Sequence, residues 1–192
     1  SFLLKAKAAN PDAIVLSGLV DETVRALKQS YEVGIPKSVA RVANSVASKV
    51  EVPTNAGKAA VGVTYAAAFA ASDKRPIAKK FVKKIKDKYG VVPGHDFSQM
   101  QDLLDMLRPA LEKAQLKFSG NLASDRNAVR DSIASITNFT GLASGPIGFC
   151  AAGSPECRDG NKTPVMIEYT KGGKNWKTKV AGTVTFNPSA GL

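Results

Sequence analysis

The first third of the chain alternates short apolar runs with amphipathic segments, and this order constrains the fold more than any other feature. Residues 12–17, Asp-Ala-Ile-Val-Leu-Ser, form an apolar run typical of a buried parallel strand. A helix is predicted over 21–31, because two acidic residues begin it and apolar residues recur at helical spacing until Gly34 and Pro36 end it. A second strand is predicted over 39–42. Strand-to-helix units in succession indicate an α/β fold.

The remainder has a helical middle and a β-rich end. The predicted elements are a loop with a short helix over 43–52, a helix from Pro53–Asn55 to Ala60, a strand within 61–69, helices over 76–89, 97–114 and from Ser124 or Asp125 to Ile133, and strands within 139–149 and 164–170. The helix over 97–114 has an apolar face made by Met100, Leu103, Leu104, Leu107 and Leu111. A turn at 171–174 precedes a last β-rich run. The sequence therefore predicts an α/β architecture with an incomplete sheet.

The longest apolar region, residues 61–71, is interrupted by Gly62 and Thr64. A membrane-spanning helix needs about 20 predominantly apolar residues, so no membrane span is expected. The first residues have helical spacing, but they lack an initiating Met and the apolar core of a signal peptide. We therefore expect the chain to begin inside a helix of a longer protein.

The net charge of +11 raises the question of nucleic-acid binding. The densest run of lysines lies within 73–88, where Ile77, Phe81, Val82 and Ile85 recur between them. This pattern is typical of an amphipathic helix with a solvated outer face. We favour such a face over a nucleic-acid surface.

Two cysteines, Cys150 and Cys157, flank a segment rich in turn-forming residues. We predict a small disulfide loop, with two free thiols as the alternative. A disulfide would place the protein in an oxidising compartment such as the periplasm. A zinc site is not expected, because His95 is the only histidine and no further cysteine is present.

The chain lacks the usual signatures of catalysis. It has no Gly-x-Ser-x-Gly elbow, no phosphate-binding Gly-x-x-x-x-Gly-Lys loop and no His-Glu-x-x-His pair. The adjacent His95 and Asp96 are more typical of a helix start than of a base with its orienting carboxylate. Asp102 and Asp105, about one helical turn apart, are a weak signal for a metal or for acid-base chemistry. We therefore expect a binding module with no cofactor, not an enzyme.

Eight short blocks, in a fixed order over nearly the whole chain, carry a family resemblance. They are residues 4–15, 27–35, 60–63, 76–90, 101–104, 110–114, 139–149 and 169–174. The most extensive, Pro76 to Gly90, combines Phe81, a lysine-rich face and a Tyr-Gly ending. In this order the blocks resemble the type I periplasmic substrate-binding proteins of branched-chain-amino-acid-type ABC transporters.

The resemblance implies two Rossmann-like lobes joined by crossover strands, with a ligand held in the cleft between them. It also implies that the N-terminal half of the family pattern is missing, so that neither lobe is complete. We expect residues 1–62 to form the end of lobe two, and 63–138 to form a crossover and helices that return to lobe one. Residues 139–192 would then form a closing β-rich segment with the disulfide loop.

The resemblance also identifies candidate ligand-binding residues. They are Ser17, Gly18 and Leu19 after the first strand and Asn44, in the stretch from about Val42 to Asn44, after the second. Arg41, which could pair with an acidic ligand, and Tyr65, which could stack on a ligand, are further candidates. Each has a structural alternative: a strand end for Ser17, the core for Leu19, a turn for Asn44, a solvated or ion-paired side chain for Arg41, and hinge packing, which is favoured, for Tyr65. The loop after the second strand has no carboxylate before Glu51, so it lacks an obvious counter-charge for an amino-acid ligand.

These observations predict a periplasmic solute-binding component of an ABC importer that takes up an amino acid or another small organic acid. The expected partners are the small-molecule ligand, the missing N-terminal portion of the same protein and the transporter permease. A ligand-sensing regulatory domain with the same fold is the first alternative. A basic nucleic-acid-binding domain is the second.

Overall fold

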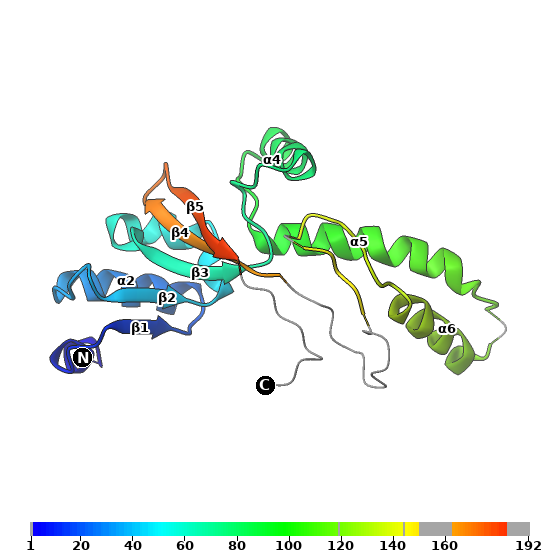
Figure 1. Ribbon diagram of the computed structural model, residues 1–192, viewed down its shortest axis with the longest axis horizontal. Helices are drawn as coiled ribbons and strands as arrows, with labels where there is room; N and C mark the ends of the chain where they lie inside the picture. The colour runs from blue at the N-terminus through cyan, green and yellow to red at the C-terminus, as the bar shows by residue number, and fades with distance from the viewer. Residues whose placement is uncertain (1, 119, 144, 150–162, 184–192) are drawn as a thin grey trace.

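A five-stranded sheet with an appended group of helices forms the structure (Figure 1). The computed structural model describes residues 2–118, 120–143, 145–149 and 163–183. The strands are β1 (Ala13–Leu16), β2 (Ala40–Ala43), β3 (Val63–Ala67), β4 (Val165–Lys171) and β5 (Lys177–Thr183), in that spatial order. The first three strands are parallel, and β4 pairs antiparallel with both β3 and β5. The α/β fold with an incomplete sheet is therefore confirmed.

One face of the sheet is covered by the helices that connect its parallel strands. These elements are α2 (Val20–Glu32), the 3-10 turn η1 (Ser45–Ser48), α3 (Glu51–Ala56) and the 3-10 turn η2 (Gly57–Ala60), preceded by α1 (Phe2–Ala8). Leu27 of α2, Val52 of α3 and Val63 of β3 are fully buried in a common core with Ile167 and Tyr169 of β4. Alternate residues of β2, β3 and β4 point to this core, as the pleat of a sheet requires.

The prediction of a buried first strand is wrong in one respect. β1 is parallel, as expected, but it lies at the edge of the sheet, and Val15 is 74% exposed on the face opposite the helices. The continuous apolar run of β1 is typical of a strand covered on both faces, and only one of those faces is covered by the described residues.

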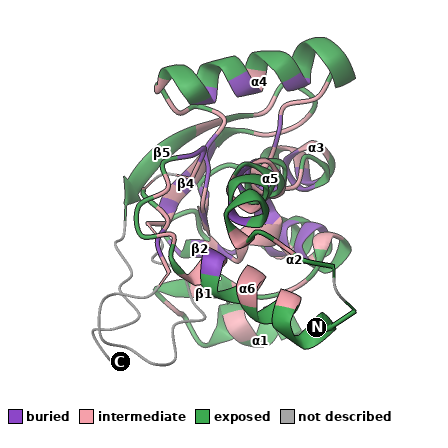
Figure 2. Ribbon diagram, turned by 90° about the vertical axis from the view of Figure 1, so that its right-hand side faces the viewer, coloured by how far each residue is buried: buried purple, intermediate pink, exposed green. Residues whose placement is uncertain are grey.

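The second part of the molecule is helical. It contains α4 (Pro76–Tyr89), α5 (His95–Ala114) and α6 (Leu122–Ala134), of which α5 and α6 lie against each other beyond the sheet (Figure 1). The predicted apolar face of α5 does not lie in a core, because Met100, Leu103 and Leu104 are all about half exposed. Figure 2 accordingly shows much of α5 and α6 as exposed surface.

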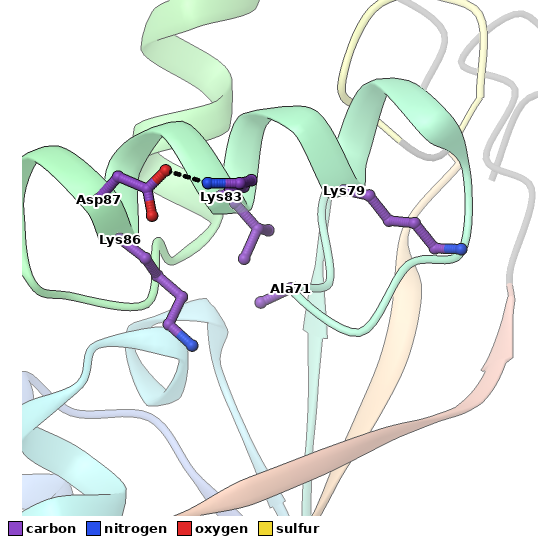
Figure 3. A pocket seen from close by; sticks show the side chains of 6 residues that line it. Ala71, Lys79, Lys83, Lys86 and Asp87 are labelled. Atoms are coloured by element: carbon purple, nitrogen blue, oxygen red, sulfur yellow. Dashed lines mark hydrogen bonds and ion pairs between the residues drawn. The ribbon is translucent and has the colours of Figure 1, made fainter.

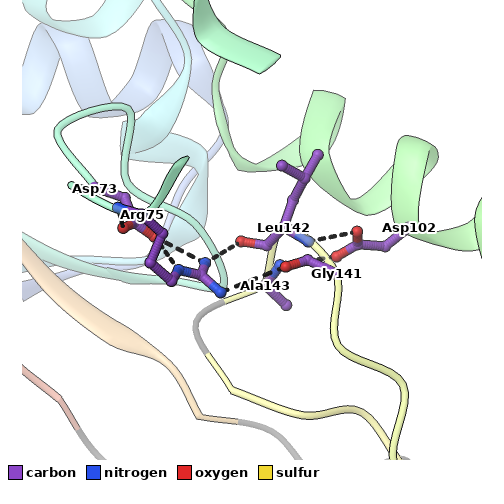
Figure 4. Close-up of polar contacts among 6 residues, drawn as sticks. All are labelled: Asp73, Arg75, Asp102, Gly141, Leu142 and Ala143. Atoms are coloured by element: carbon purple, nitrogen blue, oxygen red, sulfur yellow. Dashed lines mark hydrogen bonds and ion pairs between the residues drawn. The ribbon is translucent and has the colours of Figure 1, made fainter. Parts of the chain in front are cut away.

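A partly buried polar network joins the helical part to its connecting segments (Figure 4). The Asp102 carboxylate of α5 accepts hydrogen bonds from the backbone N–H groups of Leu142, at 2.7 Å, and Ala143, at 2.8 Å. Arg75, just before α4, donates to the carbonyl oxygens of Leu142 and Gly141 and pairs with Asp73. The outgoing and returning connections are thereby tied to each other and to α5.

This network explains why the predicted strand within 139–149 is wrong. The described residues there contain only one isolated bridge, between Phe139 and Ile147. Backbone groups of Gly141, Leu142 and Ala143 that a sheet ladder would use are instead bonded to Arg75 and Asp102.

Two helix starts also differ from the prediction. α3 begins at Glu51, because Pro53 occupies a first-turn position where its missing N–H costs nothing. α6 is capped by Asn121, whose side-chain oxygen accepts from the Ser124 N–H, while Asp125 accepts from backbone N–H groups before the helix. In the described part of the chain, no helix is both long and apolar enough to cross a bilayer.

Candidate functional site

The loops that follow β1 and β2 lie side by side at the carboxyl edge of the sheet. Leu16 and Ala43 are paired in the parallel register, so the two strands end at the same level. The Asn44 side-chain amide donates to the Gly18 carbonyl oxygen at 3.2 Å, and the Asn44 backbone N–H donates to Leu16 at 3.1 Å. The structure thus brings together four of the predicted site residues, Ser17, Gly18, Leu19 and Asn44.

Two buried oxygens at this edge have no hydrogen-bond partner among the described residues. They are Asn44 Oδ1 and Thr23 Oγ1. Thr23 Oγ1 is 3.7 Å from the position that a Cβ atom on Gly18 would take, so both oxygens lie around Gly18. Buried polar atoms are normally satisfied, so a ligand or a water molecule is expected to supply the missing partner. Thr23 was not predicted; its only signal is a polar residue on the buried side of an amphipathic helix.

Leu19 is 71% exposed, which excludes a core role in the described structure. It is the N-cap residue of α2 and supplies no side-chain cap, and Ser17 beside it is also exposed. The loop after β1 therefore presents an apolar side chain and uncapped backbone N–H groups at the same edge.

Arg41 and Tyr65 lie apart from this group, on the helix-covered side of the sheet. Arg41 shares that side with Ala43, two residues on, and is 5% exposed with no partner for its Nε among the described residues. Tyr65 is 4% exposed and packs on Tyr169, with 5.2 Å between ring centroids. Burial, partly offset by the hydrogen bond with Tyr169, raises the pKa of Tyr65 to about 12. The placement of Tyr65 agrees with a packing role. Arg41 is neither solvated nor ion-paired among the described residues, so the structural alternative expected for it is wrong.

The amino end of α5 contacts the loop that follows β2. Lys49 forms an ion pair with Asp96, which joins η1 to the first turn of α5. A Cβ atom at Gly94 would lie 3.0 Å from the Ser48 carbonyl oxygen, so the two backbones approach closely. This contact links residues far apart in the sequence and was not predicted. His95 and Asp96 do start the helix, as expected, but the Asp96 carboxylate is held by Lys49.

This contact should weaken in mild acid. Burial lowers the pKa of His95 below its ordinary value of 6.5, with Asp96 opposing the shift and Lys49 adding to it. The folded state disfavours the protonated imidazole. The contribution of His95 to the free energy of unfolding is therefore fully present above its unfolded pKa and falls as the pH drops below about 6.5. Partial burial alone would raise the pKa of Asp96. The hydrogen bond and the positive charge of Lys49 outweigh this effect, so the pKa of Asp96 is also lowered. The loss from Asp96 therefore begins only at lower pH.

We expect urea unfolding midpoints to fall between pH 7 and about pH 5.5, and to fall less in a His95→Gln variant. The comparison at pH 7 controls for any change in packing. Equal pH dependence in the two proteins would assign the effect to other groups.

Neither a metal site nor the predicted disulfide has support from the described residues. No group of three metal-ligating side chains occurs in the part of the chain that the structure describes. Cys150 and Cys157 lie outside the described residues, so the disulfide stays a prediction.

Comparison with known proteins gives a consistent result. The family model described as periplasmic binding protein matches residues 1–156. The leucine-binding protein of Thermotoga maritima is 27% identical, with a TM-score of 0.74, and the match covers 98% of this chain and 48% of that one. A branched-chain amino acid substrate-binding protein of Streptococcus pneumoniae, solved with isoleucine, is 22% identical, with a TM-score of 0.75 and coverages of 96% and 48%.

A solute-binding protein of Rhodopseudomonas palustris, solved with 3,4-dihydroxybenzoic acid, has the same fold at 22% identity. Its TM-score is 0.71, and the match covers 99% of this chain and 50% of that one. The chain thus spans about half the length of these solved structures. No curated protein sequence matches it.

Proposed function

Because this chain belongs to the periplasmic binding protein family, we propose that it binds a small organic solute at the carboxyl ends of β1 and β2, as part of the solute-binding component of an ABC importer. The observation that carries the proposal is the Asn44 side chain, which holds the loop after β2 against Gly18 in the loop after β1. Ligands of α/β sheets bind in the crevice outside the carboxyl ends of the strands. Members of this family are binding proteins, not enzymes.

The chemistry of this edge supports a polar solute with an apolar part. Asn44 Oδ1 has no partner among the described residues and could accept a hydrogen bond from a solute, and the Thr23 hydroxyl, also without a partner there, could donate or accept one. The exposed Leu19 side chain supplies apolar surface beside them. An amino acid or another small organic acid fits this description, and similar solved proteins carry isoleucine or 3,4-dihydroxybenzoic acid. Arg41 and Tyr65 are buried apart from these groups and are not proposed to touch the solute.

The remaining parts of the site are proposed to come from the N-terminal portion of the same protein. Apolar surface is open where such a portion would pack, at Val15 on the sheet and at Met100, Leu103 and Leu104 on α5. We assign residues 1–62 to lobe two, 63–138 to the crossover and the helices of lobe one, and 139–192 to the closing segment. The proposed location is the periplasm, with the transporter permease as partner.

The role of Asn44 can be measured by isothermal titration calorimetry. With isoleucine, benzoate and 3,4-dihydroxybenzoate as probes, we expect Asn44→Ala to weaken binding of the preferred probe about tenfold, because the variant frees the two loops and removes an acceptor. Asn55→Ala is the matched control, since Asn55 is exposed on α3. Equal affinity of Asn44→Ala and the unchanged protein would overturn the site. Failure of all three probes to bind would overturn the proposed solute class.

A further inference from the structure

The outward side of α4 is a continuous basic surface, separate from the proposed solute site. Five exposed lysines form it, and we call them the α4 lysine face: Lys79, Lys80, Lys83, Lys84 and Lys86. The opposite side of the helix is fixed, because Ala78, Phe81 and Ile85 are buried together with Phe69 and Leu142. Figure 2 shows the buried residues of α4 on the side that faces the rest of the molecule. The lysines therefore stay directed to solvent.

Little of this charge is neutralised. Asp87 is the only acidic residue of α4, and it pairs with Lys83 one turn earlier. Within the described part of the chain, the other four lysines of the face form no ion pair. The face therefore carries a large share of the net charge of +11 on one helix about 21 Å long.

A groove runs along one edge of this face (Figure 3). Its volume is about 360 Å³, and it is lined by Lys79, Lys83, Lys86 and Asp87 together with Ala71 and Val82. Asp87 pairs with Lys83, so Lys79 and Lys86 are the lysines of the groove that are left to meet an anionic group, beside apolar surface at Ala71 and Val82.

Apolar side chains also flank the face at both ends of the helix. Ile77 at the start is 46% exposed, and Tyr89 at the end is 57% exposed. The Lys88 ammonium lies 5.2 Å from the centre of the Tyr89 ring. Tyrosine and long lysine stems with charged ends are the side chains that settle at the boundary between water and lipid.

We propose that the α4 lysine face docks on an anionic phospholipid surface. Lysine ammonium groups on flexible stems act as point charges that adapt to a plane of phosphates. α4 contains no arginine, the residue that forms bidentate bonds with individual carboxylates or phosphates in an ordered partner. The contact is a peripheral one and holds the protein close to a membrane.

Vesicle sedimentation tests this proposal. The unchanged chain should bind vesicles of mixed phosphatidylglycerol and phosphatidylcholine, should not bind pure phosphatidylcholine, and should be released by salt. Each lysine near such a surface contributes about fivefold to partitioning, so the triple variant Lys80→Gln, Lys83→Gln, Lys84→Gln should bind about a hundredfold more weakly.

The matched control removes the same charge elsewhere. Lys171→Gln, Lys174→Gln, Lys177→Gln changes three exposed lysines at the β4–β5 hairpin and should leave partitioning within a few-fold of the unchanged chain. Equal losses in the two triple variants would overturn the proposal, since net charge alone would then explain binding. Binding to random duplex DNA that depends on the α4 lysines, without binding to anionic vesicles, would overturn it in favour of a nucleic-acid surface.

Discussion

Replacing Asp102 by alanine is expected to lower the free energy of unfolding by about 3 kcal/mol. Asp102 is 3% exposed, and its two carboxylate oxygens each accept a backbone N–H, from Leu142 and from Ala143. The variant would leave two donors without a partner where water does not reach them easily. Urea denaturation monitored by circular dichroism measures the change.

Asp105→Ala provides the control in the same helix. Its carboxylate is exposed and, among the described residues, accepts only from the Gln101 side chain, at 2.9 Å, so we expect a change within about 0.5 kcal/mol. Similar losses in the two variants would mean that the network around Asp102 contributes nothing beyond helix propensity.

Replacing Gly172 by alanine is expected to cost about 3 kcal/mol of stability. A Cβ atom at this position would overlap the Gly57 carbonyl oxygen, and neither backbone can move aside as a side chain would. The neighbouring Gly173 N–H also donates to the Pro53 carbonyl oxygen at 2.8 Å, so the turn between β4 and β5 is pressed against the end of α3.

Gly182→Ala on β5 is the matched comparison, because no atom of the described residues lies within 4 Å of its Cβ position and its backbone is not left-handed. We expect this variant to be neutral or slightly more stable, since alanine restricts the unfolded chain. A Gly172→Ala protein as stable as Gly182→Ala would show that the turn is not in close contact with α3.

Both ends of α4 were predicted correctly, because local sequence signals mark them. Pro76 fits the first helical turn, and Gly90 adopts a left-handed backbone with φ of 71° that ends the helix. Both signals lie at the helix ends themselves. The strand predicted within 139–149 failed because Asp102, 40 residues away, takes its backbone N–H groups.

In the candidate site, too, some features could be predicted from the sequence and others could not. The loops after β1 and β2 were predictable, because parallel strands bring their carboxyl ends to one edge. The directions of the Arg41 and Tyr65 side chains depend on which face of the sheet the helices cover. The family resemblance did not tell which residues of each strand point to that face. The ion pair between Lys49 and Asp96 joins residues 47 apart, so no local pattern could reveal it.

The pairing of β3 with β4 bears on how the chain is made. Thr64 lies opposite Glu168, and α4, α5 and α6 are all encoded between these neighbours. During synthesis, β3 therefore leaves the ribosome with an unpaired edge, and three helices follow before its partner exists. An exposed strand edge pairs readily with other chains. Strands that are far apart in the sequence also pair slowly. We therefore expect mispairing of β3 mainly before β4 has been synthesised, and less in the folded protein, where β4 covers this edge.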